Sequence, residues 1–208
     1  IDVVFEKGIA DEHIPGAVVA IARHGKLAYF KSFGMQNTAA NLPMRTDSIF
    51  RIYSMTKPIV SVGTMILHEA AELYLSEPVA KYLPELTNMM VAKPDENPET
   101  DTSGSQMVPA DQPIKIHDLL RHTSGFTYGF FGQSPAKQKL KQSGLANITS
   151  LDTPLDQFVT RLSTLPLAYQ PGTHWEYGRS TDVLGYLIEV ISGENLNSFL
   201  REGIFKLL

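Results

Sequence analysis

The hydrophobic pattern of the chain changes once, near residue 53, and this change limits the folds that the sequence can adopt. Residues 17–22 are a continuous apolar run, and residues 27–34 follow after a short turn signal. Runs of this length, rich in β-branched and aromatic residues, predict a β-hairpin whose first strand is buried on both faces. A short helix is predicted over residues 2–13. The chain therefore opens with a helix and a hairpin.

From residue 54 onward the pattern is almost entirely helical. Residues 54–73 carry apolar side chains three and four positions apart, with Pro58 in the first turn, where a missing N–H costs least. Residues 93–113 contain four prolines among acidic residues and are predicted to be a solvated loop. Further helices are predicted over the segments 114–122, 134–142, 152–164, 180–192 and 194–206. These patterns indicate an α+β protein in two parts, residues 1–52 and residues 53–208.

The composition excludes several classes of protein. With 208 residues, of which 43% are hydrophobic, the chain is long enough to bury a core and too apolar to be disordered. Its formal net charge of −4 argues against nucleic acid as a partner, and its apolar runs are too short to span a membrane. The absence of cysteine excludes disulfides, thiolate zinc sites and a cysteine nucleophile. No leader segment is visible, so a cytoplasmic and a periplasmic location both fit the sequence.

A Ser-x-x-Lys spacing occurs twice, at Ser54–Lys57 and at Ser134–Lys137, and context separates the two. Ser54 opens the long predicted helix, so Ser54 and Lys57 share one helical face with side chains close enough to touch. The helix N-terminus favours loss of the serine proton, and apolar neighbours are expected to lower the pKa of Lys57, which can then act as a base or assist one. Ser134 precedes a lysine-rich stretch typical of a solvated surface. From spacing alone, Ser54 also fits an ordinary N-cap serine.

Four sequence blocks resemble, in order, the class C branch of the serine β-lactamase and penicillin-binding protein superfamily. Residues 50–58 resemble its nucleophile region, residues 75–84 its L-D-D-P-V-x-K-Y-L-P segment, residues 114–125 its I-T-I-R-D-L-L-x-H-T-S-G segment, and residues 171–180 its P-G-x-x-x-x-Y-S-N motif. The resemblance implies a β-lactamase/transpeptidase-like fold, with an antiparallel sheet flanked by helices plus a mostly helical domain. It also implies a third motif on a further strand, which nothing late in the sequence resembles. We therefore expect the chain to be the N-terminal part of a longer protein, with only the first hairpin of that sheet present.

The resemblance also implies roles for individual residues. It makes Ser54 the nucleophile, and Lys57 and Tyr177 the groups that move its proton. His122 and Ser124 are expected to shape the loop beside the site. The expected substrate-binding residues are Tyr128, Trp175, beside the catalytic tyrosine, and Arg179. Tyr128 lies in a glycine-interrupted aromatic loop, which fits an aromatic packing cluster equally well. No metal or cofactor is implied.

Two departures from the family pattern shift the expected substrate. Gly178 replaces the usual serine, and Arg179 replaces an asparagine that helps to hold the substrate amide in class C β-lactamases. These departures weaken the case for an efficient β-lactamase, whereas the continuation at residues 180–185 and the acidic excursion before Ile114 look more like the family VIII carboxylesterases. We therefore predict a serine hydrolase that cleaves small acyl esters through an acyl-enzyme. The alternatives are a class C β-lactamase or D-alanyl-D-alanine carboxypeptidase with a β-lactam or peptide substrate, and a non-catalytic homologue or inactive fragment.

Overall fold

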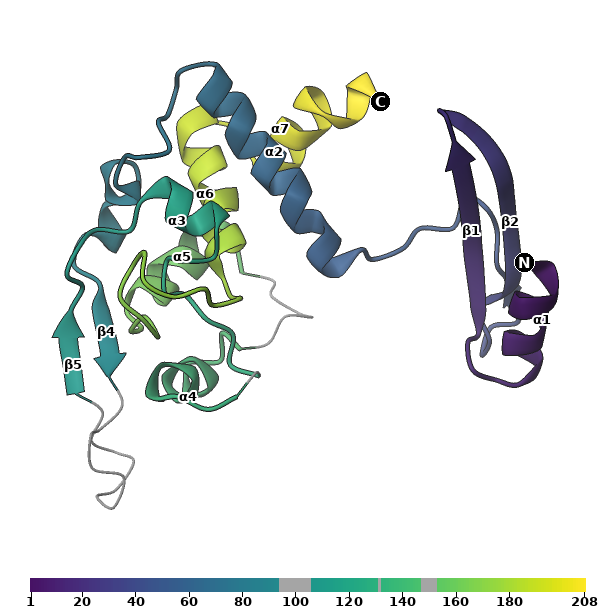
Figure 1. Ribbon diagram of the computed structural model, residues 1–208, viewed down its shortest axis with the longest axis horizontal. Coiled ribbons are helices and arrows are strands. Elements are labelled where there is room, and N and C mark those ends of the chain that lie inside the picture. The colour runs from purple at the N-terminus through teal and green to yellow at the C-terminus, as the bar shows by residue number, and fades with distance from the viewer. Residues whose placement is uncertain (94–105, 131, 147–152) are drawn as a thin grey trace. The chain divides into compact units, whose positions relative to one another are not determined.

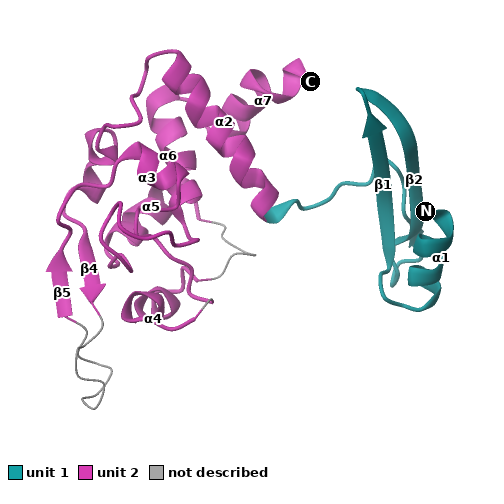
Figure 2. Ribbon diagram, viewed as in Figure 1, with its two compact units in different colours: residues 1–53 teal, residues 54–208 magenta. Residues whose placement is uncertain are grey.

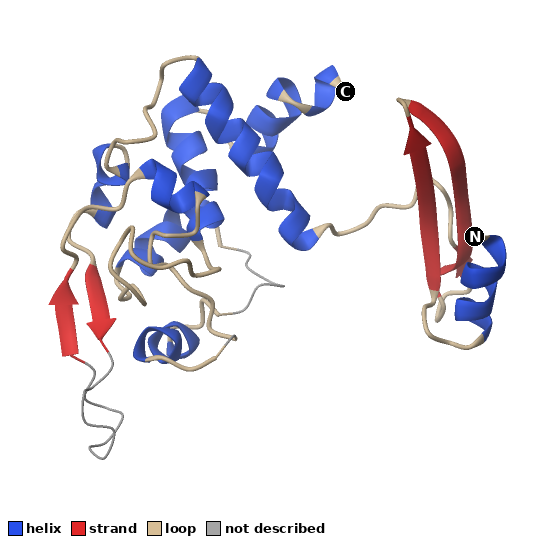
Figure 3. Cartoon of the chain, viewed as in Figure 1, coloured by secondary structure: helices blue, strands red, loops and turns tan. Residues whose placement is uncertain are grey.

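The chain folds into two compact units. The computed structural model describes residues 1–93, 106–130, 132–146 and 153–208. The first unit comprises residues 1–53 and the second residues 54–208 (Figure 2). Helices and strands both contribute, and the paired strands run antiparallel (Figure 3). The structure thus confirms the predicted α+β class.

A helix and a three-stranded antiparallel sheet form the first unit. The elements are α1 (Asp2–Ala10), β1 (Gly16–Arg23), β2 (Lys26–Asn37) and β3 (Leu42–Pro43), and the strand order is β1-β2-β3. The ring of Phe5 on α1 stacks on Phe33 of β2, with ring centroids 5.3 Å apart. The prediction that β1 is buried on both faces is wrong for the described residues, because a nine-residue helix covers only part of the sheet.

The second unit is built mainly from helices (Figure 1). α2 (Thr56–Glu69) packs along α6 (Ser180–Ser192), and α3 (Ile116–Leu120), α5 (Leu155–Ser163) and α7 (Leu196–Gly203) contact α6 as well. Gly63 allows α7 to approach α2 closely, because a Cβ at residue 63 would lie 3.0 Å from the Leu200 side chain. Burying one large apolar side chain stabilises the fold by roughly 1.5–3 kcal/mol. The helices contribute many such side chains, among them Leu67, Leu119, Phe158, Leu184 and Ile188.

The long helix is shorter than the apolar pattern predicts. It begins after one 3₁₀ turn (Tyr53–Met55) and ends at Glu69 rather than near residue 73. Its end is closed by the Glu72 N–H, which donates to the Leu67 carbonyl, while Ala71 takes a left-handed φ of 60°. A helix C-terminus of this kind usually has glycine at the left-handed position, and this chain has alanine there. No helix among the described residues is both long and apolar enough to cross a membrane.

Part of the predicted loop at residues 93–113 belongs to a second sheet. β4 (Met90–Lys93) pairs antiparallel with β5 (Gln106–Pro109), with Val91 opposite Val108. Both strands have only four residues, and residues 94–105 separate them in the sequence, so neither alternation nor hairpin spacing marks them. The prediction for residues 94–105 lies outside the described part of the chain. α4 (Pro135–Gln142) packs against β4.

Candidate active site

Ser54 lies in the 3₁₀ turn directly ahead of α2. The N-cap of this helix is Met55, which makes no side-chain cap, so Ser54 does not serve as an ordinary N-cap serine. Lys57, one turn further on, directs its Nζ to a position 3.3 Å from Ser54 Oγ. The residue before the serine, Tyr53, adopts a left-handed φ of 45°. Such backbone costs roughly 1–2 kcal/mol for a non-glycine residue and is common where a turn must place a reactive side chain.

Tyr177 reaches the same point from a distant part of the sequence. Its hydroxyl donates a hydrogen bond to Ser54 Oγ at 2.6 Å. The Lys57 ammonium lies 4.7 Å from the centroid of the Tyr177 ring. The structure therefore brings together the three side chains to which the sequence assigns catalysis.

Backbone pairing between two loops holds Tyr177 in place. Three bonds of 2.8 Å join the loops; they run from the N–H groups of Ala168, Gly172 and Glu176 to the carbonyls of Gly125, Thr123 and His122. Gly178 lies against the second loop so closely that a Cβ would approach Phe126 O to 2.3 Å. A side chain at position 178 would clash with this backbone, so the close contact between the loops requires glycine.

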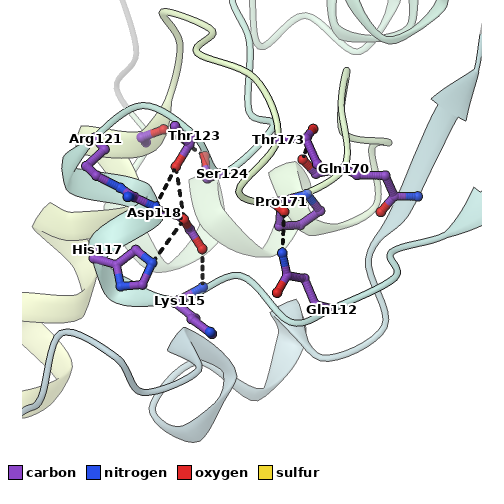
Figure 4. A network of polar contacts seen from close by, with 11 residues as sticks. Gln112, Lys115, His117, Asp118, Arg121, Thr123, Ser124, Gln170, Pro171 and Thr173 are labelled. Atoms are coloured by element: carbon purple, nitrogen blue, oxygen red, sulfur yellow. Dashed lines mark hydrogen bonds and ion pairs between the residues drawn. The ribbon is translucent and has the colours of Figure 1, made fainter.

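A polar network around Asp118 fixes the loop that carries His122 (Figure 4). The Asp118 carboxylate, 2% exposed, accepts from the Lys115 backbone N–H at 3.1 Å, from Arg121 Nη2 at 2.8 Å and from Thr123 Oγ1 at 2.9 Å. These bonds cap α3 and tie the following turn to it. Ser124 Oγ, also buried, lies 2.8 Å from Ser180 Oγ and so links the loop to α6. The polar side chains of the block at residues 114–125 thus fix the loop.

The charges at the site shift the pKa values of Lys57 and Tyr177 in opposite directions. Burial lowers the pKa of Lys57, but hydrogen bonding to Tyr177 and the attraction of Tyr128 outweigh it and leave the pKa above its usual value. This is opposite to the shift predicted from apolar neighbours. Burial alone would raise the pKa of Tyr177, yet hydrogen bonds with Lys57 and Ser54 and the lysine charge bring it below its usual value. Lys57 is therefore a persistent cation, and Tyr177 is the group that can lose a proton.

The two tyrosines beside Lys57 differ in the direction of their pKa shifts. Burial, followed by the charge of Asp182, raises the pKa of Tyr128, so Tyr128 keeps its proton while Tyr177 can release one. Titratable groups whose pKa values are driven apart by their surroundings commonly take different roles in acid–base catalysis. The Tyr128 ring lies 5.6 Å from Lys57 Nζ and 5.5 Å from the Tyr177 ring. Tyr128, a predicted substrate-binding residue, is thus next to the catalytic side chains but only 7% exposed.

Trp175 lies next to Tyr177 with its side chain exposed. Its indole is 67% exposed and stacks on the Tyr177 ring, with centroids 6.1 Å apart and planes inclined by 19°. A pocket of about 420 Å³ opens here, lined by Gly132, Lys137, Trp175, Glu176 and Tyr177. The position suits a contact with bound substrate, the role predicted for Trp175.

Arg179 lies beneath this surface. Its side chain is 3% exposed, and Nη2 donates to the Leu145 carbonyl at 2.5 Å. Its Nη1 is 3.6 Å from Asp182 Oδ1. These contacts direct the guanidinium into the protein, and the predicted contact between Arg179 and substrate stays a prediction.

His122 and Lys137 are neighbours of Tyr177 whose contacts the sequence does not indicate. The His122 ring lies 5.0 Å from the Tyr177 ring, and its Nδ1 has no hydrogen-bond partner among the described residues. Burial and the Lys57 charge lower the pKa of His122, which keeps it neutral. Lys137 Nζ is 3.0 Å from Glu176 Oε1, which also accepts from Thr127 Oγ1 at 2.5 Å. Only the block resemblance hints at His122, and the second Ser-x-x-Lys spacing marks Lys137 without indicating a place beside Tyr177.

Metal ligation finds no support in the described ranges. No group of three or more histidine, aspartate or glutamate side chains there is placed to hold an ion. The arrangement at Ser54, with a phenol in hydrogen-bond contact and an ammonium beside both groups, is one that suits activation of a serine hydroxyl.

Comparison with known proteins adds to this geometry. The sequence matches the family described as Beta-lactamase over residues 1–208. It is 34% identical over 197 residues to Esterase EstB of Burkholderia gladioli, aligned over 94% of this chain and 46% of EstB. Lovastatin esterase of Penicillium rubens is 30% identical over 210 residues, with coverage of 98% and 49%.

Solved structures give the same picture. The structure of EstCE1, described as a hydrolase with promiscuous acyltransferase activity, matches with a TM-score of 0.81 at 28% identity. The match covers 99% of this chain and 50% of EstCE1. The chain therefore spans about half the length of the relatives that it matches.

Proposed function

The chain belongs to the beta-lactamase family, and from this membership we propose that the protein is a serine hydrolase that cleaves carboxylic esters through an acyl-enzyme. The observation that carries the proposal is the contact at Ser54 Oγ, where Tyr177 Oη lies at 2.6 Å and Lys57 Nζ at 3.3 Å. The family match confirms the superfamily that the four sequence blocks indicate.

The reaction follows from the charges of these three groups. Tyr177, as phenolate beside the Lys57 ammonium, takes the proton of Ser54 as Oγ attacks the ester carbonyl. The tetrahedral intermediate collapses to the acyl-enzyme, and the departing alkoxide takes its proton from Tyr177. Water then attacks the acyl carbon, with Tyr177 again as base, and releases the acid and free Ser54. Lys57 keeps its proton throughout and stabilises the phenolate electrostatically.

Two observations favour esters over β-lactams. The relatives EstB and lovastatin esterase are named as esterases. In addition, Arg179 occupies the position of the family's amide-binding asparagine, and its side chain is buried and bonded to Leu145 O. The chain therefore offers no side-chain amide at this position for the amide that a β-lactam carries. Trp175 and the pocket beside it are proposed to contact the acyl or alcohol part of the ester.

A covalent label and a pair of substrates test the proposal. A fluorophosphonate should add to Ser54, detected by peptide mass spectrometry, and Ser54→Ala should abolish the adduct. Turnover of p-nitrophenyl butyrate should exceed that of a chromogenic cephalosporin. Faster cephalosporin turnover would favour a β-lactamase, and folded protein with unlabelled Ser54 would favour a non-catalytic homologue.

A further inference from the structure

Several groups of the second unit hold Arg179, among them four from the described part of the chain. Its guanidinium donates to the Leu145 carbonyl, lies 3.6 Å from the Asp182 carboxylate and is centred over the rings of Tyr128 and Phe158, at 5.0 and 5.2 Å. A planar guanidinium stacks on an aromatic ring in a way that a lysine ammonium cannot. Arg179 thus provides a fixed, charged surface for the Tyr128 ring.

The same ring of Tyr128 also contacts the catalytic lysine. Lys57 Nζ lies 5.6 Å from its centroid, and the attraction of Tyr128 helps to keep the pKa of Lys57 above its usual value. Tyr128 is 7% exposed and packs against Phe130 and Tyr177, with ring centroids at 4.9 and 5.5 Å. Tyr128 therefore connects a buried arginine to the ammonium that serves Ser54.

Lys57 depends on such contacts for its position. Within the described part of the chain no carboxylate forms an ion pair with it. Its ammonium lies 3.3 Å from Ser54 Oγ and 4.7 and 5.6 Å from the ring centroids of Tyr177 and Tyr128. A lysine has four rotatable side-chain bonds, so few fixed partners leave its ammonium free to move unless the surrounding rings confine it. The ring of Tyr128 is confined by Arg179.

We propose that Arg179 is a positioning residue for the reaction inferred above: its guanidinium fixes the ring of Tyr128, and Tyr128 in turn keeps the Lys57 ammonium at Ser54. The inference rests on the proposed function and gives Arg179 a role other than the predicted contact with substrate. Arg179 acts through Tyr128 and Lys57 and touches no reacting atom.

Three roles of Arg179 make different predictions. A positioning role lowers kcat and leaves KM nearly unchanged, because ester binding does not involve the arginine. A substrate-binding role raises KM. A role in folding alone lowers the thermal midpoint but leaves kcat per folded molecule and the pH profile as they are.

The test combines Arg179→Met and Tyr128→Phe with the double variant, using p-nitrophenyl butyrate as substrate. Each single substitution should lower kcat about 10- to 100-fold, the effect expected from misplacing a catalytic group by roughly 1 Å, with KM changed less than about 2-fold. The double variant should be little worse than Tyr128→Phe, because both changes act on one path. A displaced Lys57 no longer lowers the pKa of Tyr177, so the rise of kcat/KM with pH should move to higher pH.

Arg161→Met is the matched control. Arg161 also donates a guanidinium hydrogen bond to the segment just before Leu145, to Ser143 O at 2.9 Å, but it is exposed. Among the described residues, no hydrogen bond or ion pair joins it to a site residue. It should leave kcat and the pH profile unchanged. Arg179→Met with wild-type kcat and pH profile, or losses that add fully in the double variant, would overturn the proposal.

Two outcomes need separate treatment. If Arg179→Met does not fold, Tyr128→Phe decides alone, since it keeps the ring on which Arg179 stacks and removes only the hydroxyl; wild-type kcat there overturns the proposal. If the unsubstituted protein gives no Ser54 adduct with the fluorophosphonate, the proposed function fails, and with it this inference. A labelled, active protein that is indifferent to both substitutions defeats the inference alone.

Discussion

The two Ser-x-x-Lys segments of this chain share a spacing and have different environments. At the first, Ser54 Oγ meets Lys57 Nζ at 3.3 Å and Tyr177 Oη at 2.6 Å. At the second, Ser134 is the N-cap of α4 and accepts from the Lys137 backbone N–H at 3.3 Å, while the lysine side chain turns away to Glu176 at 3.0 Å. Ser54 contacts a lysine and a distant tyrosine, whereas Ser134 stabilises a helix end. What distinguishes the two segments is a third side chain, Tyr177, which comes from a distant part of the sequence and contacts Ser54.

The largest expected difference between the two segments is in turnover. Ser54→Ala removes the nucleophile and should lower kcat for p-nitrophenyl butyrate by about 10⁴-fold or more. Ser134→Ala should stay within about 2-fold of the unsubstituted protein, since a cap contributes to helix stability and not to the chemical step. Equal losses in the two variants would mean that the segments are not functionally distinct.

The lysines should differ almost as much. Lys57→Met removes the cation beside Tyr177 and should lower kcat about 10³-fold, with little change in the free energy of unfolding. Lys137→Met breaks a nearly buried ion pair, 13% and 15% exposed, and should cost about 3 kcal/mol of unfolding free energy. Urea titrations and initial rates on both variants check this. A double change, Lys137→Met with Glu176→Gln, should restore part of the lost stability because no charge is then left unpaired.

The pH dependence sharpens the same contrast. Because the pKa of Tyr177 is lowered by Lys57 and Ser54, the base form persists below pH 10, and kcat/KM should fall as the pH drops through the pKa of Tyr177. Residual activity of Lys57→Met should show this limb at higher pH, since the phenolate has lost its cation. Lys137→Met should leave the limb in place. Initial rates across the pH range measure it, and an unmoved limb in Lys57→Met would contradict the assignment of base and cation.

The smallest effect concerns the α4 cap. Ser134→Ala should lower the unfolding free energy by about 1 kcal/mol and the thermal midpoint by about 2–4 °C. Ser134→Asp keeps an acceptor for the Lys137 N–H and should lose much less. Calorimetry on the two variants distinguishes them. A destabilised Asp variant would show that the side chain does more than cap the helix.

Local patterns predicted the helices well and identified the three side chains that meet at Ser54. The apolar period at residues 180–192 coincides with α6, and residues 134–142 nearly coincide with α4. The Ser54–Lys57 contact follows from helical spacing, and Tyr177 was found through the block that surrounds it. In each case the signal lies within about ten residues of sequence.

Features that depend on distant partners were not predictable in this way. The pairing of Lys137 with Glu176 and the ring contact between His122 and Tyr177 join separate loops, and no periodicity encodes them. Arg179 carries a long side chain whose direction depends on whether Leu145 O and the Tyr128 ring are within reach. The sequence placed it correctly in the tyrosine motif but offered no information on whether the guanidinium faces the site or the core. The predicted direction of the Lys57 pKa shift was wrong for the same reason, because two phenols outweigh the effect of burial on this pKa.

The contact between Gly178 and the Phe126 carbonyl has a consequence for redesign. A Cβ at residue 178 would meet that oxygen at 2.3 Å, whereas Trp175, three positions earlier, is 67% exposed. A library aimed at new substrates can therefore vary residue 175. The main chain around Gly178 should stay unchanged, because its close contact sets how far the Tyr177 side chain reaches toward Ser54. Larger residues at position 178 would lengthen that reach and separate the phenol from Ser54. Substrate scope and catalytic power can thus be altered independently within a stretch of four residues.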